Sequence, residues 1–141
     1  MIEIYNQTKQ KINKKAIEKI VQKIVQKIKF KEKIEVSIIF VGEKKIKQLN
    51  KQYRKINKAT DVLSFGFWKL EKTQTNFGEI FIYYQKIKKQ AKIFKHSISQ
   101  ELKIILIHSI LHLLGYDHET EKDWGKMRKM EKKILIVTSN P

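Results

Sequence analysis

The stretch Leu102-Lys-Ile-Ile-Leu-Ile-His-Ser-Ile-Leu-His-Leu-Leu-Gly-Tyr-Asp-His118 is the most apolar part of the chain and decides its fold. Nine of the 13 residues from Leu102 to Leu114 are aliphatic, so a helix made from them is apolar almost all round. Such a helix must be surrounded by protein, and it is too short to span a bilayer, which takes about 20 residues. We therefore predict a central buried helix over residues 98–114.

Three of the four histidines of the chain lie in this stretch, at His108, His112 and His118. His108 and His112 are four positions apart, so on a helix they share one face, with their Cβ atoms roughly 5–6 Å apart. Gly115 can adopt the left-handed conformation that ends a helix, and the turn would bring His118 back over the same face. The fourth histidine, His96, stands alone near a predicted helix end and is expected to be structural.

The three clustered imidazoles predict a metal site. Burying two adjacent imidazoles costs desolvation, and protonating both would add like-charge repulsion, whereas a metal ion uses the lone pair of each neutral ring. Three ligands leave the fourth position of a catalytic zinc open for water. All-imidazole ligation suits zinc without excluding nickel, cobalt or copper. We predict one Zn²⁺ ion per chain. Because its three ligands are neutral, the ion keeps its full +2 charge, which attracts an anionic substrate such as a phosphodiester.

The composition points to a polyanionic partner. The formal net charge is +17, and 29 of the 31 basic residues are lysines, so that Arg54 and Arg128 are the only arginines. Part of this excess reflects a general bias toward lysine, but the charge favours RNA or DNA over a neutral substrate. There is no cysteine, which excludes disulfides and Cys-based zinc fingers. Residues 1–9 lack the apolar core of a secretory signal, so we expect a cytoplasmic protein with no membrane association.

Strand-like and helix-like segments alternate along the chain. This pattern predicts a single domain over residues 1–141, of the α/β class (α+β-like), with about four strands in a mixed sheet and about five helices. Residues 38–41 are apolar on both faces of their strand, which indicates a central position in the sheet. The expected strands are 2–6, 34–41, 61–67 and 78–84, and the expected helices are 11–30, 43–54, 85–94, 98–114 and 120–136.

The histidine spacing also occurs in metzincin proteases, whose HExxHxxGxxH motif places a general-base glutamate directly after the first histidine. Here that position is Ser109, and serine cannot replace the carboxylate that takes the proton from water. No clear Met-turn follows, because Met127 and Met130 fall within a predicted helix. A metzincin-like metallopeptidase is therefore the second choice.

The motif resembles that of a known family. His108 to His118 is similar to the HGxLHLxGYDH signature of the YbeY-type endoribonucleases, the bacterial rRNA maturation factors. Residues 49–54 and 59–65 resemble the LNxxYR and PTDVLSFP parts of a second family block, and residues 78–80 resemble its GDI strand. The resemblance covers roughly residues 34–125.

Four positions depart from the family pattern. Ala59 and Gly66 replace prolines, which set loop rigidity, and Glu79 replaces an aspartate, which keeps the charge. Ser109 replaces a glycine beside the first ligand. Because glycine permits close approach of backbone or substrate, the hydroxymethyl group of Ser109 is expected to narrow the space at the ligand face.

The resemblance implies a single-strand-specific, zinc-dependent endoribonuclease in 16S rRNA 3′-end maturation and ribosome quality control. It implies zinc on His108, His112 and His118, and ribosomal RNA and the small ribosomal subunit as partners. It also implies a functional arginine at Arg54, which we predict to be catalytic. A noncatalytic ribosome-assembly factor with structural zinc is a third possibility.

The chemistry of two further residues is compatible with these roles. The guanidinium of Arg54 can bind phosphate bidentately, as a lysine ammonium cannot. The alternative is that Arg54 is only a surface cation that stabilises the C-terminal end of its helix. Asp117 would either orient a ligand imidazole from the second shell or shape the turn.

Overall fold

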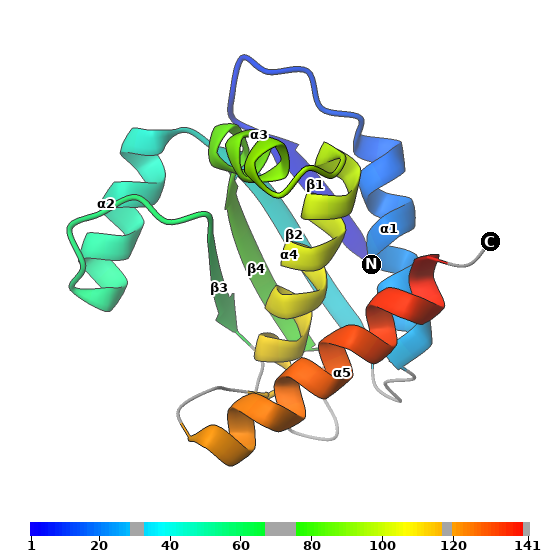
Figure 1. Cartoon of the computed structure of the whole chain (residues 1–141). Coiled ribbons are helices and arrows are strands. Elements are labelled where there is room, and N and C mark those ends of the chain that lie inside the picture. The colour runs from blue at the N-terminus through cyan, green and yellow to red at the C-terminus, as the bar shows by residue number, and fades with distance from the viewer. Residues whose placement is uncertain (29–32, 67–75, 117–119, 140–141) are drawn as a thin grey trace.

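The computed structural model describes residues 1–28, 33–66, 76–116 and 120–139. Within these residues, four strands form one mixed sheet and five helices pack on it (Figure 1), which confirms the predicted fold class. The strands are β1 (Ile2–Asn6), β2 (Ile34–Val41), β3 (Val62–Gly66) and β4 (Asn76–Tyr83). The helices are α1 (Lys14–Ile28), α2 (Glu43–Arg54), α3 (Tyr84–Ile93), α4 (Ile98–Leu113) and α5 (Glu121–Ser139).

The strands are ordered β1-β2-β4-β3. The first three are mutually parallel, and β3 pairs antiparallel with β4 at the edge of the sheet. The apolar end of β2 lies in the middle, where Ile38 pairs with Ile4 on one side and Ile80 on the other. This confirms the central position expected from its two apolar faces.

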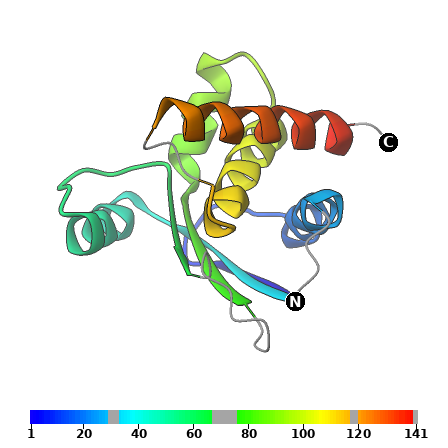
Figure 2. The same cartoon turned by 90° about the horizontal axis from the view of Figure 1, so that it is seen from below.

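Each face of the sheet has its own core, because neighbouring side chains of a strand point to opposite faces. Ile38 and Phe40 face the larger core, which includes residues of α1, α3, α4 and α5. Ile39 and Val41 face a smaller core formed with α2. Figure 2 shows α2 on the side of the sheet opposite α1 and α4.

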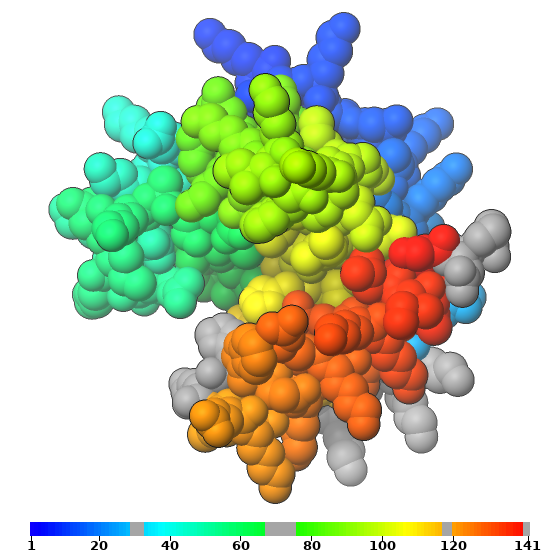
Figure 3. Space-filling model, in the orientation of Figure 1, coloured from blue at the N-terminus to red at the C-terminus, as the bar shows by residue number. Residues whose placement is uncertain are grey.

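Helix α4 is the centre of the larger core, as predicted. Leu106, Ile110 and Leu111 are completely buried, and only a strip of α4 is visible between α3 and α5 in the space-filling view (Figure 3). The helix begins at the cap residue Ser97, whose hydroxyl accepts a hydrogen bond from the Gln100 N–H at 3.0 Å.

His96, the isolated histidine, makes a polar contact at this end of α4. Nε2 of His96 lies 2.6 Å from Oε1 of Glu101, whose side chain is almost completely buried. The contact gives a buried carboxylate a polar partner, which is the structural role expected for His96.

None of the described helices combines the length and the apolar character needed to cross a membrane.

Candidate metal centre

Helix α4 carries His108 and His112 on one face near its C-terminal end. Their ring centroids are 6.4 Å apart and the ring planes differ by 5°, so the two imidazoles are parallel. The His108 side chain is 35% exposed and His112 is exposed. The structure thus brings two of the three expected ligands together at the surface of an otherwise buried helix.

The hydrogen bonds of both rings determine which nitrogen carries the lone pair. Nδ1 of His112 lies 3.1 Å from the carbonyl oxygen of Tyr116, and a carbonyl can only accept, so Nδ1 carries the proton. Nδ1 of His108 lies 3.4 Å from Oε2 of Glu131, where an ionised carboxylate is likewise an acceptor. In both neutral rings the lone pair is then on Nε2. Ligating histidines are usually held by such an acceptor at the other ring nitrogen, so this pair suits a divalent metal.

The turn after α4 supplies the acceptor for His112. Gly115 has φ of +100° and its N–H bonds to the carbonyl of His112 at 3.1 Å, which confirms the helix-ending conformation predicted for this glycine. The next N–H, of Tyr116, returns to the carbonyl of Leu111 at 3.1 Å. This backbone path places the Tyr116 carbonyl beside the His112 ring.

Asp117 and His118 lie outside the described residues, so the third ligand and the carboxylate that would orient a ligand imidazole stay predictions. Among the residues that are described, no three His, Asp or Glu side chains come together as a metal site.

Glu131 is a further residue of the candidate site, and it was not predicted from the sequence. It belongs to α5, and its side chain is 26% exposed. Its position was a usable signal, because it falls at helical spacing between Met127 and Ile134, which are both 1% exposed. An acid at helical spacing from core residues needs a polar partner, and here that partner is His108.

Ser109 does not affect the ligand face in the way expected. It is completely buried, because adjacent helical residues point about 100° apart and its neighbour His108 takes the outward position. Its hydroxyl therefore cannot narrow the space at the ligand face, and that expectation is wrong. It cannot serve as a proton acceptor there either. Its Oγ has no hydrogen-bond partner in the described structure.

Arg54 and the two histidines belong to helices that pack on opposite faces of the sheet. It is the exposed last residue of α2, followed by Lys55 in the left-handed conformation. Helix α2 packs on the opposite face from α4, and both helices end at the same end of the sheet (Figure 1). Strand β3, which both helices contact, is the edge strand of the sheet on this side.

Gly66 shows that one departure from the family pattern matters for the backbone. This residue ends β3 with φ of +129°, which proline cannot adopt because its ring holds φ near −65°. A Cβ atom at this position would lie 2.4 Å from the carbonyl oxygen of Phe77. Strand β3 therefore ends in a backbone conformation that only glycine adopts without strain. The change from the family's proline to Gly66 alters the path of the backbone as well as the rigidity of the loop.

Comparison with known proteins places the chain in a family. The family model described as endoribonuclease YbeY matches residues 3–138. A protein named endoribonuclease YbeY from Thermodesulfovibrio yellowstonii is 50% identical over 71% of this chain and 64% of its own length. One of the same name from Limosilactobacillus reuteri is 35% identical over 95% of this chain and 94% of its own length. The solution structure of TM1509 from Thermotoga maritima is similar with a TM-score of 0.67 and 33% identity, over 98% of this chain and 89% of that one. The chain belongs to the endoribonuclease YbeY family.

Proposed function

We propose that the chain is a zinc-dependent endoribonuclease that cleaves single-stranded RNA, and that it acts in 16S rRNA 3′-end maturation and ribosome quality control in the cytoplasm. Family membership supports the endoribonuclease activity. The observation that carries the metal dependence is the pair of parallel imidazoles on α4, each with an acceptor at Nδ1. The formal charge of +17 supports a polyanionic partner such as ribosomal RNA.

One Zn²⁺ ion would be held by Nε2 of His108 and of His112, with His118 as the third ligand. When bound, the ion supplies a Lewis acid that polarises a phosphoryl oxygen and makes water more acidic. The protein's own contribution is orientation. The Tyr116 carbonyl and the Glu131 carboxylate fix the rings, and Asp117 is proposed to act in the same way on a ligand.

Arg54 would be the catalytic arginine and would act by contacting a phosphate of the RNA. Its exposure and its place at the end of α2 leave the guanidinium accessible to an extended strand. A bidentate guanidinium contact fixes the register of the backbone, which a lysine ammonium does less well. Because α2 and α4 lie on opposite faces of the sheet, this contact requires a flexible, unpaired strand.

Paired assays of cleavage and metal content test this function. Wild type, His112→Ala and Arg54→Glu would be incubated with single-stranded RNA, duplex RNA and casein, and zinc would be quantified in each purified protein. We expect wild type to cut only single-stranded RNA, and His112→Ala to lose both cleavage and zinc.

Lys51→Glu is the matched control for Arg54→Glu, since both reverse one exposed charge on the last turn of α2. We expect Arg54→Glu to reduce RNA cleavage much more than Lys51→Glu, with zinc content unchanged in both. Cleavage of casein would identify a peptidase instead. Stoichiometric zinc without cleavage of either polymer would indicate a noncatalytic assembly factor.

A further inference from the structure

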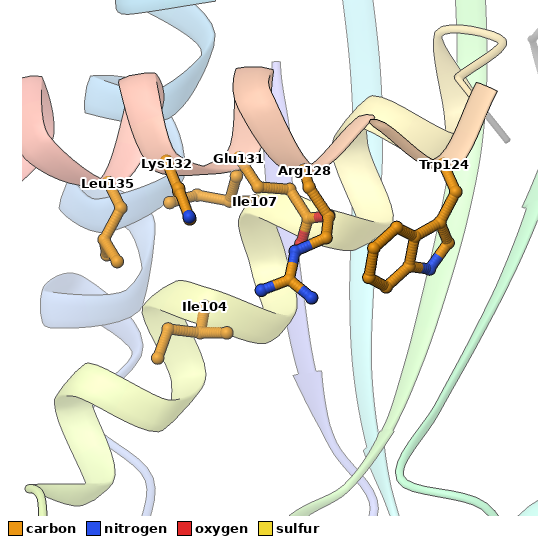
Figure 4. Close-up of a pocket in the computed structure, with 7 residues that line it drawn as sticks. All are labelled: Ile104, Ile107, Trp124, Arg128, Glu131, Lys132 and Leu135. Carbon is orange, nitrogen blue, oxygen red and sulfur yellow. The ribbon is translucent and has the colours of Figure 1, made fainter. Parts of the chain in front are cut away.

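Helices α4 and α5 enclose a cleft beside the candidate metal centre. Its volume is about 350 Å³, within the range of about 300–1,000 Å³ of small-molecule sites. Ile104 and Ile107 of α4 supply apolar walls, and Trp124, Arg128 and Lys132 project into it from α5 (Figure 4). The cleft therefore combines an apolar surface, a large aromatic ring and two cations with the single carboxylate of Glu131.

The aromatic ring in this cleft is unusually accessible. Trp124 is 48% exposed, and the guanidinium carbon of Arg128 lies 4.5 Å from its ring centroid. Trp124 and Arg128 are four positions apart on α5, so they share one face of the helix. The guanidinium lies over one face of the indole ring, and indole rings and guanidinium planes are the surfaces on which unpaired nucleobases stack in RNA-binding proteins.

The combination of an aromatic ring with cations, rather than charge alone, favours a nucleotide over an apolar or an acidic peptide side chain. Arg128 takes part in no ion pair within the described parts of the chain, so its charge is available to a phosphate. Lys132 is exposed at the same cleft. A nucleotide has a flat base for the indole and an anionic group for these cations.

The cleft is also connected to the candidate metal centre. Glu131 lines the cleft, and its carboxylate is the acceptor for Nδ1 of His108. Ile104 precedes His108 by one helical turn, which corresponds to about 6 Å along the helix axis. A strand with one base in the cleft would therefore pass beside His108.

We propose that this cleft binds one unpaired nucleobase of single-stranded RNA, which stacks on Trp124 while Arg128 contacts an adjoining phosphate. This inference rests on the proposed function, since it deepens the substrate recognition of the same site. It accounts for single-strand preference in physical terms, because a paired base is already stacked and cannot enter the cleft. Trp124 and Arg128 act here as binding residues that determine specificity.

Equilibrium binding to labelled RNA tests the cleft independently of cleavage. Fluorescence anisotropy would be measured with single-stranded RNA and with its duplex, and gels would verify that the RNA stays intact. We expect Trp124→Ala to weaken single-strand binding about 5- to 150-fold, the range for loss of one aromatic base stack. Trp124→Phe should retain most of the affinity, and duplex binding should change less than twofold, or by about 0.4 kcal/mol, in either variant.

Arg128→Ala and Lys129→Ala form a matched pair. Both remove one exposed positive charge from neighbouring positions of α5, but only Arg128 lines the cleft. We expect Arg128→Ala to weaken single-strand binding several-fold more than Lys129→Ala. Equal losses would overturn the phosphate contact, because a general charge effect would then explain both.

Intrinsic fluorescence gives a readout on the native residue. Trp68→Phe removes the other tryptophan of the chain, so the remaining emission comes from Trp124. We expect single-stranded RNA to quench this emission and to protect it from acrylamide, with no such effect from duplex RNA. Absence of quenching, or identical affinities of wild type, Trp124→Ala and Trp124→Phe, would refute the base site.

The two proposals fail in different ways. If wild type does not cleave RNA but its binding depends on Trp124, the endoribonuclease proposal fails and the cleft is still a base-binding site. If wild type cleaves RNA and the substitutions at Trp124 alter neither binding nor KM, the cleft proposal fails alone. The Trp124–Arg128 pair would then only stabilise helix α5, and Trp124→Ala would lower thermal stability without changing affinity for RNA.

Discussion

Replacing Ser109 by alanine is expected to stabilise the protein. The side chain is completely buried in α4 and its Oγ has no hydrogen-bond partner in the described structure, so folding removes the hydroxyl from water without compensation. Such a group costs about 1–3 kcal/mol, and alanine also has a better helix propensity by about 0.5 kcal/mol. We expect the free energy of unfolding to rise by about 1.5–3.5 kcal/mol.

Ser109→Gly separates the hydroxyl from the helix. Glycine removes the same hydroxyl but is about 1 kcal/mol worse than alanine within a helix, and it leaves a buried methyl unfilled, worth about 0.8 kcal/mol. The glycine variant should therefore lie about 2 kcal/mol below the alanine variant and close to wild type.

Urea unfolding followed by far-UV circular dichroism measures these differences. The order of stability should be alanine, then serine and glycine together, with equal slopes against urea. Zinc content should be the same in all three, because the side chain points away from the ligand face. A less stable alanine variant would refute the reasoning, since it would mean that the hydroxyl has a partner in the folded protein.

Three further predictions concern single positions. Gly66→Ala should lower the free energy of unfolding by about 1–3 kcal/mol, because Gly66 has a positive φ and lies close to the Phe77 carbonyl. Gly125→Ala should raise the free energy of unfolding by up to about 1 kcal/mol, because the space around its Cβ position is open. Urea unfolding of both variants tests this contrast, and equal effects would contradict it. Glu131→Ala should weaken zinc binding about 10- to 100-fold, and Glu131→Gln should weaken it less because an amide oxygen can still accept a hydrogen bond from His108. Competition with a chelator measures the zinc affinity of both variants. Unchanged affinity in the alanine variant would show that the carboxylate is not part of the site. Ser97→Ala removes the cap of α4 and should cost about 1 kcal/mol, seen as a lower thermal midpoint; no change would mean that the cap hydrogen bond adds nothing.

The features predicted correctly from sequence are those set by local patterns. Helix α4 follows from a run of aliphatic residues that admits no solvated face. The end of the helix follows from Gly115, since few other residues adopt a φ of +100° without strain. The pairing of His108 with His112 follows from their spacing alone. These inferences need only the geometry of a single helix.

The features that were missed depend on how distant segments pack. Glu131 reaches His108 only because α5 crosses α4, and no spacing along the chain encodes that crossing. Arg54 and the histidines lie on different faces of the sheet because α2 covers its own core, which a motif match cannot reveal. The inward direction of Ser109 was within reach, because the residue beside an outward-facing histidine on a buried helix must face the core.

The two acceptors behind the imidazoles come from different parts of the fold, one from the turn after α4 and one from α5. Orientation of the His108 ring therefore depends on the docking of α5, which is held by Met127 and Ile134 in the core. If the proposed zinc ion binds here, its binding and the docking of α5 would be one linked equilibrium, because an ion that prefers the native state stabilises the docked form by mass action. Metal affinity would then depend on core packing. A substitution that leaves a cavity beneath α5 would lower the metal affinity of His108 and His112 at the surface.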